Sequence, residues 1–76
     1  MNGSPLRYRI KYLLAACTQK ERVAIKGAVI DKTGISDSSF SRYINLRKAD
    51  KMDMPVFVLR AFTEVLGTTM EDLFVE

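Results

Sequence analysis

Apolar residues recur at intervals of three and four along most of this chain, and no stretch alternates convincingly between apolar and polar residues. Intervals of three and four place one side of a helix against a core, whereas alternation is the pattern of a half-buried strand. A length of 76 residues fits one domain with one small core and little room for a deep substrate cleft. We therefore predict a single all-α domain over residues 1–76.

Two helices are predicted before Gly34. Ser4 and Pro5 are a helix start signal, because Ser can accept hydrogen bonds from first-turn N–H groups and Pro is tolerated there. Thr18 and Glu21 fit a capping box, so a second helix is predicted from there to about residue 32, with a start nearer residue 25 as the alternative. The predicted inward residues are Leu6, Ile10, Leu13, Leu14 and Cys17 in the first helix, and Ile25, Val29 and Ile30 in the second.

Three shorter helices are predicted after the break at residues 33–36. Gly34 can adopt the left-handed backbone conformation at low cost, and Ser36 then caps a third helix over about residues 37–45. Residues 46–53 are polar and charged, so a loop is predicted there. Pro55 opens a fourth helix, which Gly67 closes. The predicted inward residues of this helix are Val56, Leu59, Phe62 and Leu66, and a fifth helix, capped by Thr68 or Thr69, contains Met70, Leu73 and Phe74.

The residue types that are missing exclude several kinds of site. The chain has no His and a single Cys, so neither a His-containing catalytic triad nor a Cys/His zinc site can be built within it. No Gly-rich phosphate loop is recognisable. We therefore expect no enzyme activity, no metal and no cofactor, and no small-molecule ligand is evident from the sequence. Neither a membrane-spanning run nor a signal-peptide pattern is present, and the lone Cys17 gives no sign of an oxidising compartment, so a cytoplasmic location is expected.

The positive charge is concentrated in the first two-thirds of the chain. Residues 1–51 carry 11 basic and 4 acidic side chains, whereas residues 52–76 carry Arg60 alone against 5 acidic ones. A positive field of this kind attracts polyanions. Charge alone does not separate DNA from RNA or from an acidic protein, and lysines that only keep the surface soluble are the alternative.

The segment from residue 29 to residue 45 carries the most information about function. A helix, a tight turn with Gly34 and a second capped helix have the geometry of a helix-turn-helix unit. The apolar residues that flank the turn, and that are predicted to hold the two helices at a fixed angle, are Val29, Ile30, Ile35, Phe40 and Tyr43. The outward side of the third helix is left to Asp37, Ser38, Ser41 and Arg42.

The segment VIDKTGISDSSFSRY (residues 29–43), with Pro55 and LRAFTEVLGTTMEDLF (residues 59–74), resembles the Cro/repressor-like (XRE) helix-turn-helix family of bacterial and phage DNA-binding proteins. The resemblance covers about residues 26–74. It implies a five-helix lambda-repressor-like domain and a transcriptional regulator that binds double-stranded DNA sequence-specifically. One such module makes few contacts, so a homodimer on two half-sites is expected.

The resemblance also implies which residues contact DNA. The third helix would lie in the major groove, with base contacts from Asp37, Ser38, Ser41 and Arg42. Arg42 can donate two hydrogen bonds to guanine, and Asp37 can accept one from cytosine, although a first-turn carboxylate is also stabilised by the helix dipole without DNA. Phosphate contacts are expected from Lys26, Ser36, Asn45, Arg47, Lys48 and Lys51. A solvated loop is the alternative for Lys48 and Lys51.

Several apolar residues leave alternatives open. The C-terminal residues Leu73, Phe74 and Val75 either form a self-complementary dimer patch or close the domain's own core. Met52 and Met54 belong either to the core or to a partner surface. The tyrosines expected in the core or at its edge are Tyr8, Tyr12 and Tyr43.

A protein-interaction module, such as an antitoxin-like or adaptor domain, is the alternative function. The acidic C-terminal section and the apolar residues 54–59 favour it. Replacement of Arg42 separates the two hypotheses, because it weakens a DNA complex and leaves a C-terminal protein interface intact.

Overall fold

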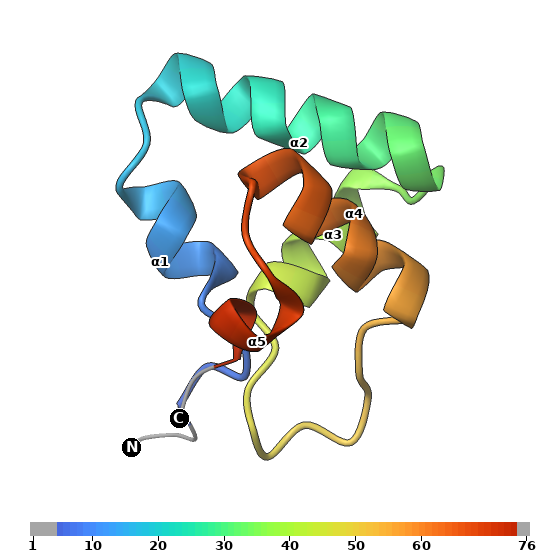
Figure 1. The fold of residues 1–76 in the computed structure, drawn as a ribbon. Helices are drawn as coiled ribbons and strands as arrows, with labels where there is room; N and C mark the ends of the chain where they lie inside the picture. Colours follow the sequence, from blue (N-terminus) through green and yellow to red (C-terminus); the bar gives the residue numbers. More distant parts are fainter. Residues whose placement is uncertain (1–4, 75–76) are drawn as a thin grey trace.

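The computed structural model describes residues 5–74 as an arrangement of five helices, with no strand in that range (Figure 1). The helices are α1 (Ile10–Ala15), α2 (Gln19–Thr33), α3 (Asp37–Ile44), α4 (Val56–Leu66) and α5 (Met70–Leu73). The all-α prediction is therefore confirmed for the described residues. Their principal extents are 32 × 24 × 23 Å.

One cluster of buried side chains holds the helices together. It joins Val29 of α2, Phe40 of α3, Phe62 of α4 and Leu73 of α5, each at most 4% exposed. Figure 1 shows α2 lying across α4, and these two helices form the most extensive helix pair. Each fully buried side chain of this size contributes about 1.5–3 kcal/mol by its removal from water. The core thus fixes α3 through Phe40, whose ring lies 5.5 Å from that of Phe62.

The predicted helix ends agree closely with the structure where a local signal sets them. Thr18 and Glu21 form the capping box, so α2 starts at residue 19 and the alternative start near residue 25 is wrong. Gly34 and Gly67 both have positive φ, at 75° and 67°, and close α2 and α4. Thr69, rather than Thr68, caps α5 by accepting a hydrogen bond from the N–H of Asp72.

The predicted start of the first helix is wrong. Ser4 lies outside the described residues, and residues 5–9 are not helical, so α1 begins only at Ile10. Leu6 and Tyr8 instead form isolated antiparallel bridges to Arg47 and Phe74. The Arg7 N–H donates to the Leu46 carbonyl (2.8 Å) and the Arg9 N–H to the Leu73 carbonyl (2.6 Å). The N-terminal segment therefore connects the α3–α4 loop with the C-terminal end of the domain.

Four apolar side chains differ from the predicted burial. Leu13 and Tyr12 are exposed, because α1 has only six residues and places just Ile10 and Leu14 in the core. Val56 is exposed because the inward stripe of α4 lies on the opposite side of the helix. Leu46 is buried although it begins the predicted polar loop.

The open alternatives for Met52, Met54 and the C-terminus are now decided in part. Met54 is in the core and Met52 is exposed. Leu73 is fully buried within the chain, so it does not belong to an exposed dimer patch. Phe74 is exposed and packs against Tyr8, whose ring centroid lies 5.3 Å away, whereas Val75 lies outside the described residues.

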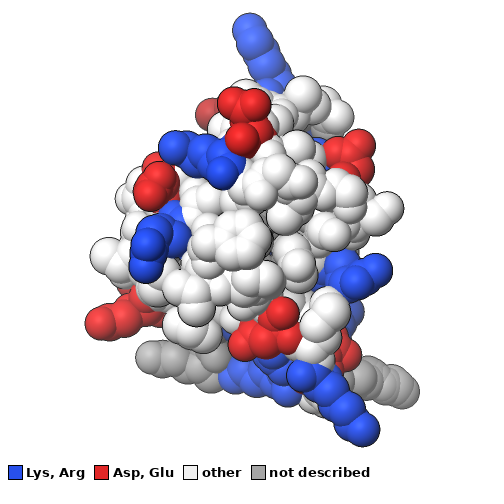
Figure 2. Space-filling model, turned by 90° about the vertical axis from the view of Figure 1, so that its right-hand side faces the viewer, with Lys and Arg blue, Asp and Glu red and all other residues white. Residues whose placement is uncertain are grey.

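The surface turned toward the right-hand side of Figure 1 has a broad uncharged area at its centre, with basic and acidic side chains around it (Figure 2). Large apolar side chains that stay exposed include Val56 and Phe57 in the first turn of α4. Exposed apolar area of this kind is a feature of protein-contact surfaces.

Candidate functional site

The connection between α2 and α3 is a short turn whose geometry follows from Gly34 and Ser36. The Gly34 N–H donates to the Ile30 carbonyl (2.7 Å), which completes the end of α2. Ser36 then caps α3 by accepting a hydrogen bond from the Ser39 N–H (3.1 Å). Because Gly34 is in the left-handed region, a residue with a side chain would be strained at this position.

The outer side of α3 presents the four side chains that were predicted to contact DNA bases. Asp37, Ser38, Ser41 and Arg42 are each exposed, and positions spaced by four along a helix share one side. The inner side is anchored by Phe40, with Tyr43 and Ile44 packed partly against the core. The structure therefore brings the predicted base-contact residues together on one exposed side of α3.

Two of these side chains have partners elsewhere in the fold. The Lys26 Nζ lies 3.8 Å from the Asp37 Oδ1, so α2 partly balances the negative charge at the start of α3. The same Nζ lies 5.8 Å from the centre of the Phe40 ring. The Arg42 guanidinium lies 4.0 Å from the Met52 sulfur, which directs it toward the α3–α4 loop. Asp37 and Arg42 both remain exposed to solvent in these arrangements.

The predicted phosphate-contact residues fall into two groups around α3. Lys26 lies on α2, beside the start of α3. Arg47, Lys48 and Lys51 are exposed in the loop that follows the helix. Lys51 and Arg42 line a hollow of about 390 Å³ between α3 and that loop. Cationic side chains thus stand on both flanks of the exposed side of α3.

Asn45 and Ser36 are engaged within the protein. The Asn45 Nδ2 donates to the Ser41 carbonyl (2.8 Å), and its Oδ1 accepts from the Lys11 Nζ (2.6 Å). Ser36 Oγ is used in the cap of α3. Their side chains hold the ends of α3, and Lys11 joins the cationic group beside α2, which the sequence did not indicate.

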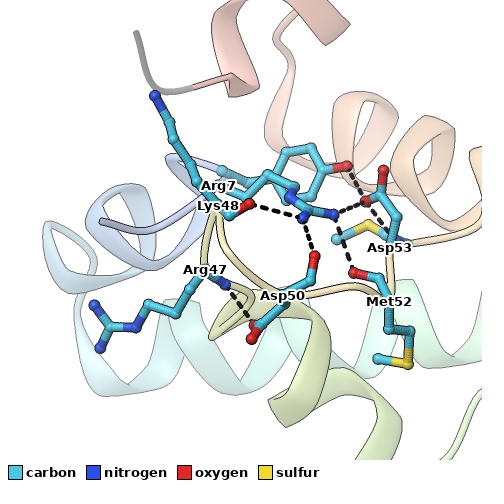
Figure 3. Close-up of polar contacts among 8 residues, drawn as sticks. Arg7, Arg47, Lys48, Asp50, Met52 and Asp53 are labelled. Carbon is cyan, nitrogen blue, oxygen red and sulfur yellow. Dashed lines mark hydrogen bonds and ion pairs between the residues drawn. The ribbon is translucent and has the colours of Figure 1, made fainter. Parts of the chain in front are cut away.

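A single arginine organises the α3–α4 loop (Figure 3). The Arg7 guanidinium donates to the backbone carbonyls of Lys48 (3.3 Å), Asp50 (2.5 Å) and Met52 (3.0 Å). It also lies 3.2 Å from the Asp53 Oδ1. We call these contacts the Arg7 clamp. Figure 3 shows the side chains of Arg47 and Lys48 pointing away from the Arg7 clamp, so the loop backbone is held while its cations face outward.

Replacement of Arg7 by Ala is expected to lower the free energy of unfolding by about 1–3 kcal/mol, because charge-assisted hydrogen bonds from a half-buried side chain are lost. Urea denaturation followed by circular dichroism measures this. Arg9→Ala is the matched control, since Arg9 is exposed and its backbone hydrogen bond survives the change. Equal losses in the two variants would contradict the role of the Arg7 clamp.

Tyr8 and Asp53 form a second polar contact beside the Arg7 clamp. The Tyr8 hydroxyl donates to the Asp53 Oδ1 at 2.5 Å, although the whole residue is only 2% exposed. Burial, together with the hydrogen bond and the negative charge of Asp53, raises the pKa of Tyr8 to about 12, and Arg7 partly opposes this. Burial alone would raise the pKa of Asp53, but hydrogen bonds from Tyr8, the Met54 N–H and Arg7 hold it below its usual value.

The raised pKa of Tyr8 predicts a loss of stability at high pH. The neutral phenol stabilises the fold fully below its ordinary pKa of 10.0, and this contribution is lost as the pH rises toward about 12. The free energy of unfolding is expected to decrease by about 1–3 kcal/mol across this pH range. Urea denaturation at several pH values across this window measures it. Tyr8→Phe is the control, because it lacks the titrating group, so a decrease of equal size in this variant would contradict the assignment.

No group of three or more His, Cys, Asp or Glu side chains is placed to hold a metal ion among residues 5–74. No helix in the described part of the chain is long and apolar enough to cross a membrane. Comparison of the chain with protein-family models, with curated proteins and with solved structures gave no match.

Proposed function

We propose that this protein binds double-stranded DNA sequence-specifically, as a small transcriptional regulator of the lambda-repressor-like kind, with α2 and α3 as its helix-turn-helix unit. The observation that supports this most is the exposed side of α3, which is polar, rigidly anchored through Phe40 and flanked by cations. A major groove of about 12 Å in width admits a helix. Inserted there, α3 directs Arg42 and its polar neighbours toward base edges.

The two flanks of α3 suit the two phosphate backbones that border a major groove. Lys26 stands on one side, and Arg47, Lys48 and Lys51 stand on the other. Contacts of this kind fix the position of a protein on the duplex without reading its sequence. The ion pair of Lys26 with Asp37 reduces repulsion between the Asp37 carboxylate and the DNA. Two copies on adjacent half-sites would supply the specificity that one module lacks.

The affinity for duplex DNA is expected to fall steeply with salt. About four phosphate contacts per protomer, and so about eight for the expected dimer, give a slope of about −7.2 in a plot of log K against log salt concentration. Fluorescence anisotropy with a labelled duplex measures this. Lys48→Gln should reduce the slope by about one per protomer, whereas Lys20→Gln, an exposed change near the start of α2, should leave it unchanged. A salt-independent affinity would contradict the proposal.

A protein-interaction module is the second candidate function, and one observation favours it. Val56 and Phe57 are 62% and 56% exposed at the start of α4. Large exposed apolar side chains mark contact surfaces more often than charged ones do. Phe57→Ser would weaken the binding of a protein partner at the start of α4 and leave DNA binding intact. Arg42→Ala would weaken DNA binding and leave the binding of that partner intact.

A further inference from the structure

A hollow of about 400 Å³ lies where α1, α2 and α3 meet. Its floor is apolar, with Leu14 from α1 and Phe40 and Ile44 from α3. Its polar rim carries the cations Lys11, Arg22 and Lys26. A volume near the lower end of the range of ligand pockets fits a small molecule. The hollow adjoins the exposed side of α3 and shares Ser41 with it, and Lys26 at its rim is also a proposed phosphate contact.

The charged residues that line this hollow are all cationic, although Asp37 lies 3.8 Å from Lys26 at its rim. Among residues 5–74, no Asp or Glu belongs to its lining. The Arg22 guanidinium is held in place by the carbonyls of Cys17 (2.7 Å) and Leu14 (3.3 Å), so its position is fixed before any ligand arrives. Lys26 stands over the Phe40 ring, which places a positive charge directly at the apolar floor. An apolar floor with cations at its rim is complementary to a molecule with an apolar body and one negative group.

We propose that this hollow binds a small organic carboxylate with an aromatic or aliphatic body. The carboxylate pairs with Lys11 and Lys26, and the body covers the floor of Leu14, Phe40 and Ile44. A DNA phosphate is a poorer occupant, because a phosphodiester would leave this apolar floor uncovered. The exposed side of α3, in contrast, is polar and suits DNA.

Occupancy of the hollow has a consequence for DNA that rests on the proposed function. A carboxylate bound to Lys26 competes with Asp37 for the same Nζ. The ligand also brings a negative charge to one flank of α3, where a phosphate would otherwise approach. The negative charges of the bound ligand and of a nearby DNA phosphate repel each other, so the ligand lowers the affinity of the protein for DNA. The reverse must hold by linkage, and DNA lowers the affinity for the ligand by the same factor.

The experiment titrates the isotope-labelled protein with naphthoate and follows backbone amide signals by NMR. For a ligand of this size, a Kd of about 1 mM is expected, with shifts confined to residues that line the hollow. Lys26→Gln and Lys11→Gln should each weaken binding about fivefold, whereas Lys20→Gln should not, because Lys20 lies outside the hollow. Arg22 is left unchanged, because its hydrogen bonds hold the end of α1.

Naphthalenemethanol, which has the same ring system without the charge, is the matched ligand control. Binding that is equally tight for the alcohol, shifts that are spread over the surface, or no saturation to about 10 mM would each overturn the proposal. Competition with a labelled duplex is a separate readout. Naphthoate that binds in the hollow without weakening DNA binding overturns the coupling alone. A protein that binds naphthoate there but no DNA supports the hollow and contradicts the proposed function.

Discussion

Phe40→Ala is expected to lower the free energy of unfolding by about 3–5 kcal/mol, because it removes a large aromatic side chain from the core and leaves a cavity. Phe40 is 4% exposed and packs against Phe62, and it is the buried residue that α3 contributes. A domain of this size has little more stability than this to lose, so the variant should be largely unfolded at room temperature. Urea and thermal denaturation followed by circular dichroism measure the change.

Phe40→Leu is the matched control for this prediction. Leucine retains most of the apolar contact with Phe62 and leaves a smaller cavity, so its cost should be clearly lower. Tyr12→Ala provides a second control, because Tyr12 is exposed and its loss should change stability by less than about 0.5 kcal/mol. If Phe40→Ala and Tyr12→Ala had similar stabilities, α3 would not be anchored as described.

Arg42→Ala is expected to weaken binding to a specific duplex by about 1–3 kcal/mol for each protomer, and so by about 2–6 kcal/mol for a symmetric dimer. The reason is that Arg42, in the proposed complex, donates two hydrogen bonds to one guanine in each half-site. Arg42 is exposed, so the fold should be unaffected. Affinities for a specific and a random duplex, measured at the same salt concentration, give both the loss and the change in specificity.

Two further variants separate base reading from charge. Arg42→Lys keeps the positive charge but cannot donate in the bidentate geometry, so it should lose specificity while it retains most of the non-specific affinity. Arg60→Ala removes an exposed arginine of α4, which lies outside the proposed surface, and should cost little. Equal effects of Arg42→Ala and Arg60→Ala would contradict a role for Arg42 in reading bases.

Local signals in the sequence were sufficient for most helix ends and for the exposed side of α3. Capping depends on residues three positions apart, as in Thr18 and Glu21, and a left-handed turn depends on Gly34 alone. The side of α3 that faces the core follows from Phe40 and its apolar neighbours. These features need no knowledge of distant parts of the chain, so the sequence indicates them directly.

The N-terminal segment could not be predicted in this way. Leu6 and Ile10 are four residues apart, which fits a helix, but Leu6, Tyr8 and Ile10 also alternate with two arginines, which fits an extended segment. The carbonyls of Leu46 and Leu73 decide in favour of the extended segment, because they accept its N–H groups. Hydrogen-bond partners this far apart in the sequence are determined by the tertiary fold, so the local residue pattern does not reveal them.

The contacts of individual charged residues could not be predicted from the sequence either. Arg7 and Arg9 have similar neighbours in the chain, yet Arg7 holds the α3–α4 loop and Arg9 is exposed. Lys26 meets Asp37 only because the turn at Gly34 brings the two helices together. Lys11 was not among the expected contact residues, because its proximity to Asn45 depends on the packing of α1 beside α3.

Selection of bound sequences from a pool of random duplexes, at near-physiological salt, tests the central claim most directly. If α3 reads DNA as a symmetric dimer, the selected pool should be enriched in a palindrome whose half-sites lie about one helical turn apart. The same selection with Arg42→Ala should lose the preference at one position of each half-site. A pool that remains random with the wild-type protein, or a palindrome that Arg42→Ala selects equally well, would contradict the account.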